Sequence, residues 1–203
     1  MKYDPIIIAG PPRSGTTMLA GLLSIHGVWV GRGRTTKYPG TNSEVVSENQ
    51  DIKNVMKATD YKNWTTPLPD HDLPIDVYHK IDNIIPDERW LVKTTWTLVH
   101  WRFWNDYAPD AKWVFPHRPE KKVLDSMNRH PGMKNRNDNK KKQFVRALHN
   151  RQKEVFKNVD GYWVDTKAIS DFNAIEINNF FRFVDIKPKW NLIREFIKPG
   201  MMK

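Results

Sequence analysis

The segment from Gly10 to Thr17 reads G-P-P-R-S-G-T-T, and its residue types are suited to binding an anion. It follows an apolar run, Ile6 to Ala9, of the kind expected for a strand buried on both faces, and an apolar helical pattern comes after it. In a strand–loop–helix arrangement, the backbone N–H groups of the loop converge at the positive end of the helix dipole. Gly10 and Gly15 permit a tight turn and a close approach of the backbone to a ligand. We therefore predict that this loop binds a phosphate group.

The spacing of the two glycines is that of the G-x-x-x-x-G nucleotide loop, but the next residue differs from the one that loop requires. A hydrolysing ATPase needs a lysine there, close to the β- and γ-phosphates, whereas this chain has Thr16. The positive charge lies inside the loop instead, at Arg13, and Thr16 and Thr17 add hydroxyl donors. An ordinary nucleoside triphosphatase is therefore disfavoured. The alternative interpretation is a Gly-Pro turn that joins strand to helix without any ligand.

The stretch from Ile6 to Gly27, IIIAGPPRSGTTMLAGLLSIHG, resembles the 5′-phosphosulfate loop of sulfotransferases that use 3′-phosphoadenosine-5′-phosphosulfate (PAPS). The P-[KR]-S-G-T-T signature of that family is complete here from Pro12 to Thr17. The resemblance implies a sulfotransferase with PAPS as donor, PAP as product and no required metal. It implies that the donor is bound by Pro12, Arg13, Ser14, Gly15, Thr16 and Thr17.

A second family motif places an arginine after a strand and a serine about eight residues later. Here Trp113-Val114-Phe115-Pro116-His117-Arg118-Pro119 is followed by Ser126. The resemblance implies that Arg118 and Ser126 hold the 3′-phosphate of the donor, and a guanidinium group can bind phosphate through two hydrogen bonds. The alternative is that Arg118 pairs with an acid such as Asp125. The resemblance covers most of residues 5–185, although only the two anion motifs are specific.

Sulfuryl transfer requires an acceptor held in line, removal of its proton, and stabilisation of charge on the leaving phosphate. Arg13 is the candidate for stabilising the leaving group, and Lys93 could reach the sulfuryl oxygens from a strand end. Glu48 is the first candidate for the general base, with Glu44 second. Further candidates are His26, His100 and His117.

Two features depart from the cytosolic branch of the family. That branch has K-T-H where this chain has Lys93-Thr94-Thr95, so the histidine is missing. Its C-terminal R-K-G-x-x-G-D-W-K segment is also missing, since the tail here is Ile197-Lys198-Pro199-Gly200. The chain thus resembles the bacterial or carbohydrate- and protein-directed branches more closely.

Apolar runs alternate with helical patterns along the chain, which predicts an α/β fold with a mostly parallel sheet of four to five strands, similar to P-loop nucleotide-binding domains. We expect one domain over residues 1–203, a loop at 31–49, and a third strand that Pro116 ends. The predicted strands are 6–9, 90–92, 113–115 and 162–164. Besides the helix after the first loop, the predicted helices are 50–58, 74–85, 97–107, 121–128, 140–157, 175–183 and 192–197.

The composition of the chain excludes cysteine-based sites and disfavours a membrane protein. The 203 residues carry a formal net charge of +10 and include no cysteine, which excludes disulfides, thiolate metal sites and cysteine nucleophiles. No run approaches the roughly 18 apolar residues of a membrane span, and the apolar start of the chain is too short for a signal peptide. We therefore expect a cytoplasmic protein without a membrane span.

Residues 134–153 form a basic run with eight Lys or Arg and one acid, Asp138. The run could recruit an anionic acceptor, such as a polysaccharide, or steer the donor; the alternative is a solvated helix face. Nucleic-acid binding is disfavoured because Phe144 is the sole aromatic residue in the run. Other functions stay open: an ATP-dependent small-molecule kinase, a non-catalytic nucleotide- or nucleic-acid-binding protein, and a sulfotransferase-like protein that no longer transfers.

Overall fold

The computed structural model describes residues 4–33, 35–37, 44–46, 48–57, 59, 66–69 and 72–197. At its centre lies a four-stranded sheet in the order β4-β1-β5-β6, in which every neighbouring pair is parallel. This confirms the predicted α/β fold with a parallel sheet. The strands are β1 (Ile6–Ile8), β4 (Leu91–Lys93), β5 (Lys112–His117) and β6 (Gly161–Asp165).

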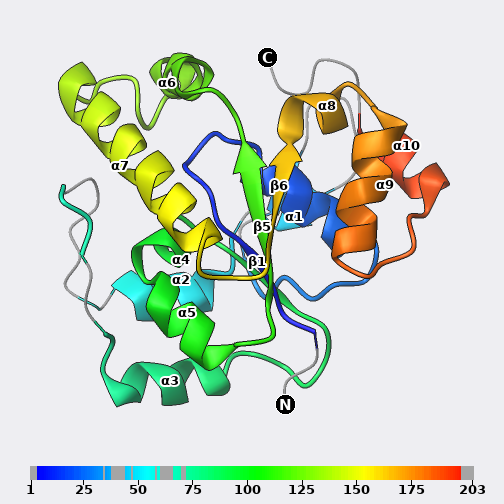
Figure 1. Ribbon diagram of the computed structural model, residues 1–203, viewed down its shortest axis with the longest axis horizontal. Coiled ribbons are helices and arrows are strands. Elements are labelled where there is room, and N and C mark those ends of the chain that lie inside the picture. Colours follow the sequence, from blue (N-terminus) through cyan, green and yellow to red (C-terminus); the bar gives the residue numbers. More distant parts are fainter. Residues whose placement is uncertain are drawn as a thin grey trace.

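The sheet is covered by helices on both faces (Figure 1). Because side chains alternate along a strand, Ile6 and Ile8 of β1 pack on one face and Ile7 on the other. The face of Ile6 and Ile8 is covered by α1 (Thr16–Ser24), α8 (Thr166–Ser170), α9 (Ala174–Phe183) and α10 (Trp190–Phe196). The face of Ile7 is covered by α2 (Gln50–Lys57), α3 (Ile75–Asp82), α4 (Trp96–Val99), α5 (Trp101–Tyr107) and α7 (Asp138–Phe156).

Helix α6 (Glu120–Arg129) packs against α7 rather than on the sheet, as Figure 1 shows at the end of β5. Its buried residues Val123 and Met127 meet Val145 of α7 in a small separate apolar cluster. In this way α6 lies beside the carboxyl ends of the strands. Ligands bind to parallel sheets at that edge.

The predicted strand 113–115 corresponds to β5, which continues through Pro116 to His117. The prediction that Pro116 ends this strand is therefore wrong. Within β5, the backbone of Val114 is hydrogen-bonded to β1, because the Val114 carbonyl accepts from the Ala9 N–H. Pro116 lies two residues later, so its backbone nitrogen also faces β1. Strand β1 has already ended at that level, since Ile8 is the partner of Val114. The Ala9 carbonyl, which an N–H at position 116 would face, accepts instead from Nε2 of Gln152 at 3.0 Å, so the missing N–H of Pro116 leaves no acceptor of the sheet unpaired.

Three further elements differ from the predicted ones, of which the short helix α8 was not predicted at all. Part of the expected loop at 31–49 forms an antiparallel pair, β2 (Thr35–Lys37) and β3 (Glu44–Val46). The expected helix 97–107 is divided at His100, whose backbone leaves the helical region and whose ring stacks on Trp96. Among the described residues, no helix combines the length and apolar character that a bilayer crossing requires.

Candidate functional site

The loop between β1 and α1 is tightly folded. Gly15 (φ 101°) and Arg13 (φ 68°) both adopt left-handed backbone conformations, which are strained for a non-glycine residue such as Arg13. The buried Ser14 hydroxyl donates to the Pro11 carbonyl at 2.7 Å and closes the turn. A Cβ at Gly10 would overlap the ring of Pro116, so the loop passes β5 at a distance that only glycine allows.

Three other segments hold the backbone of this loop in place. Arg118, just after β5, donates from Nη1 to the Arg13 carbonyl at 2.8 Å. The Thr166 hydroxyl, at the start of α8, lies 3.0 Å from the Ser14 carbonyl. The buried Gln152 of α7 donates from Nε2 to the Ala9 carbonyl at 3.0 Å. The loop geometry thus depends on β5, α7 and α8 together.

Three guanidinium groups gather beside the loop. Arg13 donates from Nε to the buried Ser126 hydroxyl at 3.1 Å, which joins the two predicted anion motifs. Burial lowers the pKa of Arg118, and the positive charges of Arg13 and Arg129 lower it further, while Asp125 opposes them. Because like charges this close repel one another, a ligand with several negative charges would stabilise the cluster.

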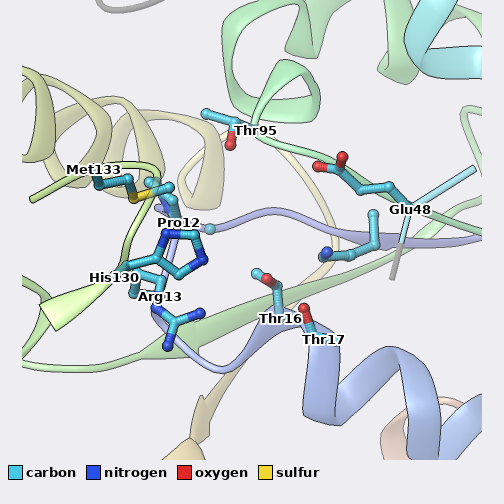
Figure 2. Close-up of a pocket in the computed structure, with 10 residues that line it drawn as sticks. Pro12, Arg13, Thr16, Thr17, Glu48, Thr95, His130 and Met133 are labelled. Atoms are coloured by element: carbon cyan, nitrogen blue, oxygen red, sulfur yellow. The ribbon is translucent and has the colours of Figure 1, made fainter. Parts of the chain in front are cut away.

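The loop opens onto a pocket of about 140 Å³ (Figure 2). Figure 2 shows Glu48 and His130 reaching into it from opposite sides, with Thr16 and Thr17 at the start of α1 between them. The pocket is lined by Gly10, Pro12, Arg13, Thr16, Thr17, Glu48, Lys93, Thr95, His130 and Met133.

Lys93, the last residue of β4, is 9% exposed in this pocket. Burial lowers its pKa to about 8, the charges of Lys53 and Arg13 lower it too, and the carboxylate of Glu48 acts in the opposite direction. At neutral pH its ammonium group therefore still carries a positive charge beside the loop.

Glu48 precedes α2 and forms an ion pair with Lys53 of that helix. The next residue, Asn49, is buried and caps α2 by accepting from the N–H groups of Asp51 and Ile52, both at 3.0 Å. This cap fixes the start of the helix and with it the position of Glu48.

The structure brings most of the predicted site residues together. Pro12, Arg13, Thr16, Thr17, Glu48 and Lys93 line the pocket, Ser14 and Gly15 shape the loop, and Arg118 and Ser126 contact Arg13. Among the alternative bases, the side chain of Glu44 lies outside the described part of the chain. His26, His100 and His117 are not among the residues that line the pocket.

Three lining residues, Thr95, His130 and Met133, were not predicted as site residues from the sequence. No local signal indicated His130, because it follows the end of α6 with an extended backbone and does not share the register of that helix. Among the described residues, no group of three or more His, Cys, Asp or Glu side chains is arranged to hold a metal ion.

Comparison with known proteins identifies the family. Sulfotransferase STF1 from Mycobacterium tuberculosis H37Rv has a similar fold, with a TM-score of 0.66 and 16% identity over 97% of this chain and 71% of that one. Sulfotransferase STF9 from Mycobacterium avium gives a TM-score of 0.62 and 13% identity over 97% of this chain and 67% of that one. No curated protein sequence matches significantly. The profile of the sulfotransferase family matches residues 5–177, so this chain belongs to the sulfotransferase family.

Proposed function

We propose that this sulfotransferase moves a sulfuryl group from PAPS to a hydroxyl or amine of an acceptor such as a carbohydrate. The observation that carries the proposal is the contact between the two anion motifs, in which Arg13 and Arg118 meet at the strand ends. PAPS carries phosphate groups on both its 5′ and 3′ sides, and two adjoining cationic sites suit such a ligand. A nucleoside triphosphate would need a lysine where this chain has Thr16.

The loop residues Pro12 to Thr17 would hold the 5′-phosphosulfate through backbone N–H groups and the hydroxyls of Thr16 and Thr17. Arg118 and Ser126 would hold the 3′-phosphate. Arg13 lies between these two groups of residues, since its Nε contacts Ser126 and its backbone belongs to the loop. Its positive charge would stabilise the phosphate of PAP as it leaves.

Glu48 and Lys93 would act on the acceptor and on the transferred group. The Glu48 carboxylate takes the proton of the acceptor O–H or N–H as the acceptor atom forms its bond to sulfur. The bond from sulfur to the bridging oxygen breaks, and its electron pair stays on the 5′-phosphate of PAP. The ammonium group of Lys93 neutralises charge on the sulfuryl oxygens. Lys53, paired with Glu48, holds the carboxylate in place.

A thermal-shift screen with PAP, PAPS, ATP and GTP tests the donor. We expect PAP and PAPS to raise the melting temperature, and we expect Arg13→Ala and Arg118→Ala each to abolish that shift. Arg182→Ala, which removes an exposed arginine of α9 that does not line the pocket, is the matched control and should keep the shift.

The screen also separates the rival functions. Stabilisation by ATP with Mg²⁺, but not by PAP, would favour a kinase. No shift with PAP at millimolar concentration would overturn the proposal, and so would an Arg182→Ala variant that loses the shift as fully as Arg13→Ala. A protein that binds PAPS but transfers to no acceptor would be the inactive, nucleotide-binding form.

A further inference from the structure

His130 follows α6 directly, and its backbone is fixed on both sides. Its N–H donates to the Met127 carbonyl at 3.1 Å, and its own carbonyl accepts from the N–H groups of Met133 and Lys134, both at 2.9 Å. The imidazole side chain is therefore presented to the pocket from a well-defined turn, with Met133 beside it (Figure 2).

The two ring nitrogens of His130 have different roles. Nδ1 accepts a hydrogen bond from the Gly132 N–H at 3.2 Å. A neutral imidazole carries one proton, so an accepting Nδ1 places that proton on Nε2. The second nitrogen of the ring is thus a hydrogen-bond donor. It cannot at the same time accept the proton of an acceptor group, which separates His130 from the role proposed for Glu48.

The charges around the pocket keep this ring neutral. Burial lowers the pKa of His130 below its ordinary value of 6.5, and the positive charge of Arg13 lowers it further. The other charged groups facing the pocket are Lys93, at the end of β4, and Glu48, which is paired with Lys53. Neutral imidazole with a directed N–H is suited to an anionic oxygen, and it adds no further repulsion to the cations already there.

Resting on the function proposed above, we infer that His130 is a catalytic residue that donates its Nε2–H to an oxygen of the transferring sulfuryl group. In the proposed binding mode the sulfuryl group would lie beyond the 5′-phosphate, in the pocket that Glu48, Lys93 and His130 line. PAPS carries this group and PAP does not. The contact should therefore strengthen the binding of PAPS but not that of PAP, and the two affinities can be compared without knowing the acceptor.

Calorimetric titration of PAPS and PAP into three proteins tests the contact. We expect His130→Ala to weaken PAPS binding by about tenfold while PAP affinity changes by less than about twofold, as the loss of one hydrogen bond to a charged group predicts. His130→Gln keeps an N–H donor but offers no basic nitrogen, and we expect it to retain PAPS affinity within about threefold. His79→Ala, which removes an exposed histidine of α3, is the control and should match the unaltered protein.

The outcomes distinguish this inference from the proposed function. If the unaltered protein binds neither PAP nor PAPS, the proposed function fails. If it binds both, and His130→Ala changes the two affinities equally or not at all, only the sulfuryl contact is overturned. Nitrogen-15 NMR of the unaltered protein gives an independent test that needs no variant. We expect the Nε2–H tautomer at neutral pH, whereas an Nδ1–H tautomer would contradict the donor role.

Discussion

Lys93 illustrates how a single buried charge can give the site its pH dependence. Its pKa is lowered to about 8 chiefly by burial, so its ammonium group loses its proton as the pH rises through that value. We expect an anionic donor to bind the protonated form, so that its binding is favoured below the pKa and weakened above it.

We expect PAPS affinity to fall by about tenfold between about pH 7 and about pH 9, as the protonated fraction of Lys93 falls around its pKa of about 8. Lys93→Met should bind more weakly at neutral pH and lose most of this pH dependence. Titration calorimetry at several pH values measures both effects. Lys80→Met, at an exposed lysine of α3, should keep the full dependence. An unaltered pH profile in Lys93→Met would rule out Lys93 as the titrating group.

Single site residues could be predicted from the sequence where a short motif contains the functional groups. The loop from Pro12 to Thr17 could be recognised because its glycines, arginine and hydroxyls lie within six residues of one another. His130 could not, because no local pattern distinguishes it from the other histidines. Its place in the pocket depends on how α6 packs on α7.

Among the elements, the close passage of the first loop over β5 depends on a glycine at position 10. Gly10 lies against Pro116, and a Cβ there would also come within 2.8 Å of the Ser14 hydroxyl oxygen, which itself closes the turn. The strand and the loop are further joined by Gln152, which donates to the carbonyls of Ala9 and Pro116 at 3.0 and 3.2 Å.

We expect Gly10→Ala to lower the free energy of unfolding by about 1–3 kcal/mol, as overpacking does, and to weaken PAP binding because the loop must shift. Chemical denaturation and calorimetry give the two readouts. Gly132→Ala is the control, since a Cβ there would make ordinary contacts of 3.5 Å with His130. Adding Pro116→Ala to Gly10→Ala should recover part of the stability. A Gly10→Ala protein as stable as the unaltered one would contradict this prediction, because it would show that the loop can accommodate a Cβ at position 10.

Most elements could be predicted because hydrophobic periodicity is a local property. The runs at Ile6, Leu91, Trp113 and Tyr162 all lie in strands of the sheet. The strand through Pro116 could not be predicted, since its tolerance depends on where the neighbouring β1 ends. The pairing of β2 with β3 could not be predicted either, because the residues of these two strands lack the apolar alternation typical of a strand.

Over the whole molecule, the net charge of +10 should speed the approach of an anionic donor. The basic run at 134–153 begins in the turn that carries His130 and continues along α7, so part of that charge lies beside the pocket. Lys134, Lys140 and Lys142 are all exposed.

We expect the association rate of PAP, measured by stopped-flow mixing, to fall as salt is added and to fall several-fold in a Lys134→Glu/Lys140→Glu variant at low salt. The dissociation rate should change little, because neither lysine lines the pocket. Lys187→Glu/Lys189→Glu makes the same charge change at exposed residues before α10 and serves as the control. If association were slowed equally in both variants, the net charge of the protein alone would set the association rate, and the position of the basic run would play no part.

The contact between Thr166 and the Ser14 carbonyl joins residues 152 positions apart in the chain. During synthesis on the ribosome, the loop from Pro12 to Thr17 is therefore made long before Thr166, one of the residues that hold it. A nascent chain that stops short of β6 and α8 would carry the complete Pro12–Thr17 motif and still lack the fixed geometry to recognise its ligand. Donor recognition should thus be gained late in translation, when the last strand of the sheet has left the exit tunnel.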